Sequence, residues 1–149
     1  MHDFLRLKRG FTLVEFILVI TLVIVLSGIS IPLYRSFQMR NELEVAANTL
    51  VFSLRQAQIL AHAVADDNNW GIKIMVGQII VFRGANFVSR TVADDISYDL
   101  PQAVTPTGMG EVVFNKFLGE PQVAGSIILT SNTNETRTIT INSKGMVSF

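Results

Sequence analysis

The sequence has no cysteine, only two histidines and few charged residues, and each shortage narrows the possible functions. Without cysteine the chain can form neither a disulfide framework nor a thiolate metal site. Its 12 basic and 12 acidic residues cancel, so net charge predicts no general affinity for nucleic acid. Because the sequence also has no nucleophile motif, phosphate-binding loop or catalytic carboxylate pair, we expect a protein that is not an enzyme.

Apolar residues, in contrast, make up 49% of the 149 residues and concentrate near the N-terminus. Residues 1–10 form a short basic lead, and residues 11–33 follow with Glu15 as their only charge. As a helix rising about 1.5 Å per residue, this run is long enough to cross a bilayer. The basic lead favours a cytoplasmic N-terminus, although Arg35 and Arg40 follow the span closely. We therefore expect a single-pass membrane protein with its C-terminal part on the far side.

The start of the apolar run combines a small residue, an aromatic residue and a glutamate at fixed spacing, in the segment Gly10-Phe11-Thr12-Leu13-Val14-Glu15. This pattern resembles the N-terminal signal of type IV pilins and type II secretion pseudopilins. The resemblance implies that a prepilin peptidase cuts between Gly10 and Phe11 and methylates the new amine, giving N-methylphenylalanine. It also implies that the apolar run stays attached. An assembly ATPase and a platform membrane protein would then move the subunit from inner membrane lipid into a filament of pilin or pseudopilin subunits.

Glu15 is a lone carboxylate in an apolar segment, and such a group persists only where something offsets its desolvation. The resemblance implies a salt bridge to the cationic N-terminus of a neighbouring subunit, which would set the register of helices during assembly. The alternative is that Glu15 reaches the lipid headgroups.

Gly28 and Pro32 both weaken a helical hydrogen-bond pattern. One interpretation is a kink in a continuous helix, as the resemblance to pilin-like proteins implies. The other is a boundary between two helices.

From residue 34 to residue 65, apolar residues recur every three or four positions, which predicts an amphipathic helix. Its stripe contains Leu43, Ala46, Leu50, Leu54, Ala57, Ala61 and Val64. The stripe is short and rich in alanine, so we expect it to pack on a sheet rather than form a coiled coil. The run Asp66-Asp67-Asn68-Asn69 favours turns and is expected to end the helix.

Residues 66–149 have the pattern of a β-rich head. Strands are predicted at 70–76 and 79–83, joined by a type II′ turn at Gly77-Gln78, and then at 111–117, 126–130, 137–141 and 146–149. The predicted fold is α+β and pilin-like: a long N-terminal α-helix, with a transmembrane half and an amphipathic half, packed on one antiparallel β-sheet. The order of the head resembles H-type minor pseudopilins and FimT-like minor pilins.

Two further groups of residues are candidate ligand sites. Asp94, Asp95 and Asp99 offer oxygen ligands for calcium from a predicted loop, but they lack EF-hand spacing and acidic loops are usually just hydrated. No other cofactor is expected. Some FimT-like relatives bind DNA through basic residues near the C-terminus, where this chain has Arg137 and Lys144. From residue 66 onward the chain contains six basic and eight acidic residues, and this excess of negative charge disfavours nucleic acid as a partner.

The sequence thus favours a structural, minor subunit of a type IV pilus or of a type II secretion pseudopilus, supporting pilus biogenesis or protein secretion. One alternative is a DNA-binding minor pilin for DNA uptake. Another is a secreted binding protein with an ordinary signal peptide, because Gly28-Ile29-Ser30 offers small residues at a plausible cleavage position.

Overall fold

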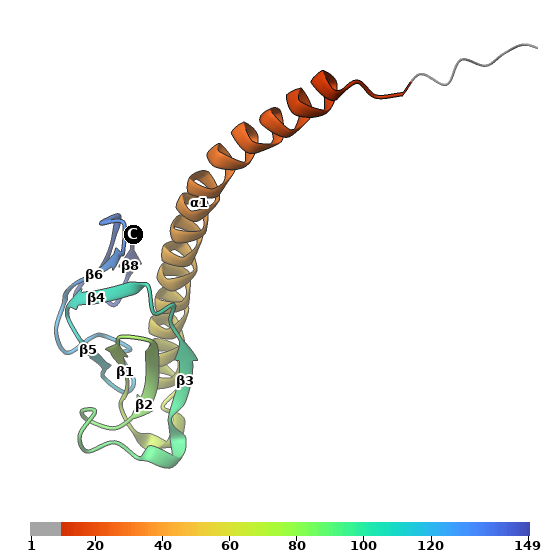
Figure 1. Cartoon of the computed structure of the whole chain (residues 1–149). Coiled ribbons are helices and arrows are strands. Elements are labelled where there is room, and N and C mark those ends of the chain that lie inside the picture. Colours follow the sequence, from red (N-terminus) through yellow and green to blue (C-terminus); the bar gives the residue numbers. More distant parts are fainter. Residues whose placement is uncertain (1–9) are drawn as a thin grey trace, which may run out of the picture. The chain divides into compact units, whose positions relative to one another are not determined.

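The computed structural model describes residues 10–149, apart from the side chains of residues 29–33, 35 and 36. The chain divides after Phe37 into two compact units, which are described separately. One α-helix, α1, runs from Leu13 to His62 and contributes to both (Figure 1). The predicted helical pattern at 34–65 is therefore part of a longer helix that begins near the N-terminus.

The expected membrane span is not found. In the part of the chain that the structure describes, no helix combines the length and the apolar character that crossing a membrane requires. Spanning hydrocarbon takes about 20 consecutive apolar residues, and the described part of α1 does not supply such a stretch. This corrects the transmembrane half predicted at 11–33 and the single-pass inner-membrane location derived from it.

The amphipathic stripe is confirmed. Its six residues from Leu43 to Ala61 are buried, whereas Val64 is only half-buried because α1 has already ended at His62. Beyond that point Val64, Asp66 and Asp67 adopt left-handed backbone angles, with φ between 52° and 54°. Aspartate tolerates this conformation better than most residues, so the chain turns here through a 3₁₀ segment, η1 (Ala65–Asp67).

Among residues 10–149, eight strands form two antiparallel sheets, which corrects the single sheet predicted from the sequence. Strands β1 (Trp70–Met75), β2 (Gln78–Arg83), β3 (Ile96–Asp99) and β5 (Glu111–Phe114) form sheet A in the order β3-β2-β1-β5. Strands β4 (Val104–Gly108), β6 (Gly125–Ser131), β7 (Thr136–Ile141) and β8 (Val147–Ser148) form sheet B in the order β4-β6-β7-β8. A second 3₁₀ segment, η2 (Val92–Asp94), precedes β3.

The pairing of strands, and not the residue pattern within each strand, determines which strands belong to which sheet. β5 pairs with β1, while β4 pairs with β6, so the chain crosses from one sheet to the other on each side of β5. β4 contains Pro106, which has no N–H to donate, and the strand accordingly lies at the edge of sheet B. Strands β3 and β4 were both absent from the prediction.

The β1–β2 hairpin turns one residue earlier than predicted. Met75 pairs with Gln78, so the two-residue connection is Val76-Gly77 and Gln78 belongs to β2. Gly77 has φ 85° at the second connecting position, whereas a type II′ turn needs its positive φ at the first. The predicted type II′ geometry is therefore wrong.

The core of residues 38–149 lies between α1 and the inner faces of both sheets. Its largest fully buried side chains include Leu50 and Leu54 from α1, Phe114 from sheet A and Leu129 from sheet B. A smaller cluster of Ile80, Phe82 and Val113 lies on the other face of sheet A, with Met75 and Phe87 packed against it. The core thus fixes the buried side of α1 and leaves its opposite side exposed.

Candidate functional site: the apolar segment of α1

The start of α1 is capped by Thr12. The Glu15 amide donates to the Thr12 hydroxyl at 3.2 Å, and the Phe16 amide donates to the Thr12 carbonyl at 3.1 Å. Threonine at the N-cap with glutamate three residues later is a helix-start signal, and a carboxylate in the first turn also interacts favourably with the helix dipole. Thr12 and Glu15 therefore help to define where α1 begins, a role readable in the sequence but missed there.

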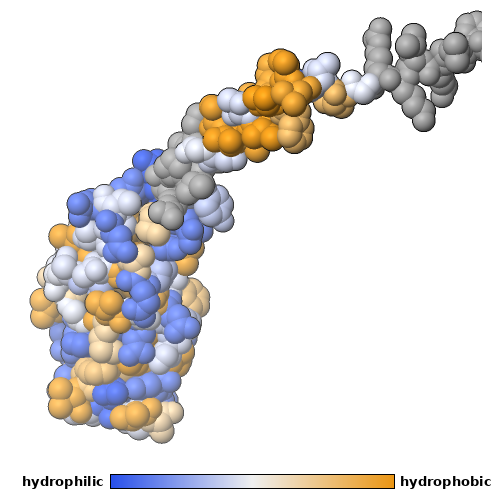
Figure 2. All heavy atoms as spheres, in the orientation of Figure 1, coloured by the Kyte–Doolittle hydropathy of each residue, from blue (hydrophilic) through white to orange (hydrophobic). Residues whose placement is uncertain are grey.

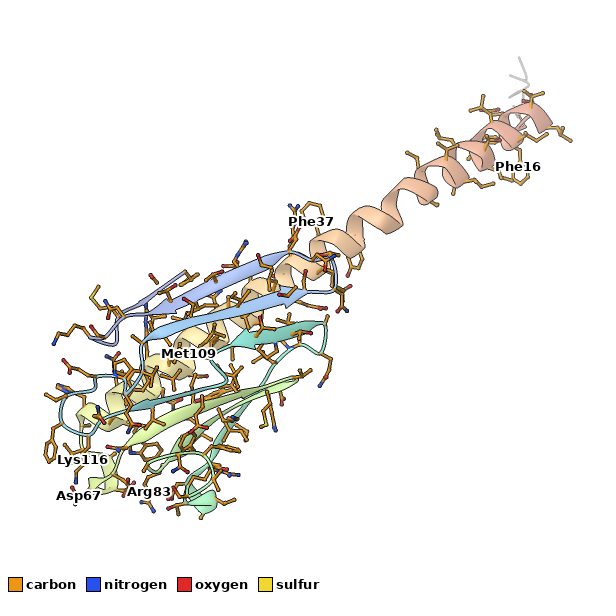
Figure 3. All side chains as sticks on the ribbon, turned by 90° about the vertical axis from the view of Figure 1, so that its left-hand side faces the viewer. Phe16, Phe37, Asp67, Arg83, Met109 and Lys116 are labelled. Carbon is orange, nitrogen blue, oxygen red and sulfur yellow. The ribbon has the colours of Figure 1, made fainter. Side chains whose placement is uncertain are left out.

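Residues 11–26 carry exposed apolar side chains in nearly every position, and we call them the apolar segment. Thirteen large hydrophobic residues are between 43% and 80% exposed: Phe11, Leu13, Val14, Phe16, Ile17, Leu18, Val19, Ile20, Leu22, Val23, Ile24, Val25 and Leu26. Figure 2 shows a nearly continuous hydrophobic surface on the visible face of this segment, and Figure 3 shows Phe16 pointing away from the helix. A helix that is apolar on all sides is one that becomes buried in its working state.

Two hydroxyl side chains in the N-terminal half of α1 form hydrogen bonds within the helix. The Thr21 hydroxyl donates to the Ile17 carbonyl at 2.8 Å, and the Ser27 hydroxyl donates to the Val23 carbonyl at 2.7 Å. Such back-bonding to the preceding turn leaves no hydroxyl proton unpaired. Both side chains can therefore enter an apolar environment without losing a hydrogen bond.

Glu15 differs from these residues. Its side chain is exposed, and among the described residues it has no hydrogen-bond or ion-pair partner. Burying the segment would remove this carboxylate from water, which costs several kcal/mol unless a cation accompanies it. The geometry therefore makes Glu15 the one group in the segment whose burial needs an external partner.

The predicted cleavage position lies just before the helix. Gly10 and Phe11 are both exposed and non-helical, and a Cβ on Gly10 would meet no atom within 4 Å. The backbone at this position is therefore accessible to a peptidase. Of the predicted kink pair, Gly28 is exposed within α1, whereas the Pro32 side chain lies outside the described residues, so the kink stays a prediction.

The three aspartates considered as calcium ligands have different surroundings. Asp94 Oδ2 lies 2.6 Å from Arg83 Nη2 in an ion pair without aligned hydrogen-bond geometry, and Asp95 accepts two bonds from Arg90 Nε at 2.8 and 3.1 Å. Asp99 is exposed at the end of β3. Within residues 10–149 as described, no group of three or more ligating side chains could hold a metal ion.

The two basic residues considered for DNA contact are each engaged by a carboxylate. Arg137 Nε lies 3.5 Å from Glu44 Oε2, and Lys144 Nζ donates to Glu120 Oε1 at 2.7 Å. This hydrogen bond, together with the negative charge of Glu120, raises the pKa of Lys144 above its ordinary value. In this arrangement each of the two cations therefore has a carboxylate neighbour within the same chain.

The end of α1 carries a separate apolar surface. Ile59 and Leu118 are 66% and 67% exposed and line a shallow hollow with His62, whose Nδ1 lies 2.7 Å from the Phe117 carbonyl oxygen. Figure 3 places Asp67, Arg83 and Lys116 near the same end of the head. No local sequence signal indicated this surface, because it depends on the loop after β5 lying against α1.

Comparison with known proteins gives no family assignment: no family model matches the chain, and no solved structure matches it significantly.

Proposed function

We propose that this protein is a structural subunit of a helical filament, of the type IV pilus or type II secretion pseudopilus class, and that it assembles through the apolar segment. The observation that supports the proposal is the exposure of thirteen large hydrophobic side chains within residues 11–26. Exposed apolar surfaces of this extent mark interaction sites. A bundle of identical segments would cover all sides of each helix at once.

The energetic balance favours association even with Glu15 present. Fully burying one large apolar side chain contributes about 1.5–3 kcal/mol, and thirteen are available. Loss of rigid-body freedom opposes association by about 4–15 kcal/mol, and an unpaired carboxylate adds several more. Burial of most of the segment exceeds these costs when a cation accompanies Glu15, whereas each buried carboxylate without a partner lowers the affinity by several kcal/mol.

Processing by a prepilin peptidase is the step that would precede assembly. We expect co-expression with such a peptidase to yield a chain that begins at methylated Phe11, as measured by mass spectrometry of the intact product. Replacing Gly10 with the bulkier phenylalanine should leave the full-length chain on a gel, because the small residue at the cut position is lost. The matched control is Gly28→Ser, which lies outside the cut position and should be processed normally. A product that begins at Ile31 would contradict the proposal.

The second expectation concerns Glu15. Glu15→Leu keeps the helix and its apolar character but removes the one charge that needs a partner, so incorporation into filaments should fall by about tenfold or more, the effect of losing about 1.4 kcal/mol. Co-sedimentation of tagged variant with wild-type subunits measures it. Glu42→Leu is the matched control, because Glu42 lies on α1 outside the apolar segment and accepts a bond from Gln38 at 3.0 Å. Normal incorporation of Glu15→Leu would count against a role for this carboxylate in assembly.

A further inference from the structure

The turn between β6 and β7 leads into the tripeptide Asn134-Glu135-Thr136. Asparagine followed two positions later by serine or threonine, with no proline between them, is the acceptor motif for attachment of an oligosaccharide to the asparagine amide. The chain has nine asparagines, and Asn134 is the only one that fits this pattern. A motif this short is informative only in a suitable structural context, namely an exposed loop.

The backbone around Asn134 forms a defined turn. The Asn134 amide donates to the Ser131 carbonyl at 2.9 Å, and the Ser131 amide donates to the Glu135 carbonyl at 2.8 Å. Asn134 has φ 61°, in the left-handed region that asparagine adopts more readily than most residues. The Glu135 carboxylate is bound by Arg40 of α1, with Nε and Oε1 2.9 Å apart. The turn therefore holds Asn134 in a fixed position at the end of the β6–β7 hairpin.

The side chains of Asn134 and Thr136 are both exposed. Among the described residues, neither the Asn134 carboxamide nor the Thr136 hydroxyl forms a hydrogen bond, whereas the nearby Ser131 hydroxyl bonds the Thr133 hydroxyl at 2.9 Å and accepts from the Glu135 amide at 3.2 Å. Neither Asn134 nor Thr136 belongs to a core cluster, so a bulky group on Asn134 displaces no core side chain. An enzyme can therefore reach both groups of the motif from solvent.

Two other asparagines in hairpin turns show the contrast. Asn132 is exposed on the same turn, but the residue two positions after it is Asn134. Asn142 lies in the turn before β8, where its side-chain oxygen accepts from the amides of Lys144 and Met146 at 2.9 Å each. The Asn142 side chain thus stabilises its turn, whereas the Asn134 side chain is left unbonded at a position with the acceptor motif.

We propose that Asn134 is an N-glycosylation site that receives an oligosaccharide from a lipid diphosphate carrier. In this transfer Asn134 Nδ2 bonds to the anomeric carbon of the first sugar. The bond from that carbon to the diphosphate oxygen breaks, and the lipid diphosphate leaves with the bonding electrons. The amide nitrogen gives one proton to a base of the transferring enzyme, so the step needs no oxidant or reductant. The inference rests on the proposed function, because this motif is used in exported proteins and subunits of such filaments are exported.

Peptide mass spectrometry of the full chain, isolated from the organism that makes it, tests the site directly. We expect an added sugar mass on the peptide that contains Asn134, and complete loss of that mass in Asn134→Gln and in Thr136→Ala. Thr136→Ser should keep the sugar, because serine also satisfies the motif. The matched control is Asn132→Gln on the same turn, which should be modified like the wild type. Unmodified Asn134 in the wild-type chain, or a sugar that persists in Thr136→Ala, would overturn the inference.

Filament assembly is measured on the same preparations, so that the glycosylation site and the proposed function can fail separately. Wild-type filaments with unmodified Asn134 would refute the site and leave the filament function intact. A glycosylated chain that forms no filaments would refute the filament function and leave the site intact. Fluorescence of the buried Trp70 verifies that each variant is folded, so loss of the sugar is not mistaken for loss of structure.

Discussion

Phe114→Ala is expected to lower the free energy of unfolding by about 3–5 kcal/mol, the range for truncating a fully buried phenylalanine. Phe114 is 0% exposed, pairs with Trp70 across β1 and β5, and belongs to the core that joins α1 to both sheets. Its removal leaves a cavity that neighbouring elements can fill only by shifting. Denaturant unfolding of the full chain measures the change. The chain's single tryptophan, Trp70, reports it by fluorescence because it is 5% exposed in the folded state.

Phe117→Ala is the matched control for this prediction. Phe117 lies three residues later, is 60% exposed, and contacts only the Lys116 ammonium group at 5.5 Å from the ring centroid among the aromatic contacts of the described residues. Its truncation should lower the free energy of unfolding by less than about 1 kcal/mol. Equal losses for the two variants would mean that the core between α1 and sheet A does not dominate stability.

Ile20→Asp is expected to abolish filament assembly, with a loss of about 100-fold or more in the sedimenting fraction. Ile20 lies in the middle of the apolar segment and is 43% exposed, so its side chain becomes buried if the segments bundle. A carboxylate there loses its hydration without a partner, at a cost of several kcal/mol per subunit. Electron microscopy and sedimentation of the processed full chain measure the effect.

Val88→Asp provides the comparison at an exposed apolar position away from the segment. Val88 lies in the loop between β2 and β3 and is 93% exposed, so the same chemical change there should leave assembly within about twofold of wild type. The contrast separates a role of the apolar segment from a general effect of added negative charge. Assembly of Ile20→Asp at the wild-type level would exclude the apolar segment as the filament contact.

The spacing of apolar residues along the chain was sufficient to predict much of the fold. The stripe from Leu43 to Ala61 is buried because a helix with apolar residues at spacings of three and four has only one side that can enter a core. Strands β1, β2, β5, β6, β7 and β8 each overlap a predicted strand, since alternating or continuous apolar runs between turn residues favour extended backbone. Thr12 and Glu15 also carried a readable helix-start signal.

The sequence-based predictions were wrong where contacts between residues distant in the chain determine the structure. β3 has only four residues and adopts a strand because Tyr98 packs on Phe52 and β2 offers a free edge. β4 contains Pro106 and is extended because it pairs with β6 in an antiparallel arrangement. The membrane span was predicted from apolar character summed over residues 11–33, and the described helix does not support it. The aspartates near residue 95 were grouped by sequence proximity, yet two of them pair with separate arginines.

The sequence by itself determined the apolar segment with its single charge, the buried stripe of α1 and most of the strands, because each depends on spacing between residues that are near one another in the chain. Tertiary structure alone decided the division into two sheets and the pairing of most charged residues in the range 38–149. These features depend on which distant residues meet, as Arg40 meets Glu135 and Lys116 meets Asp67.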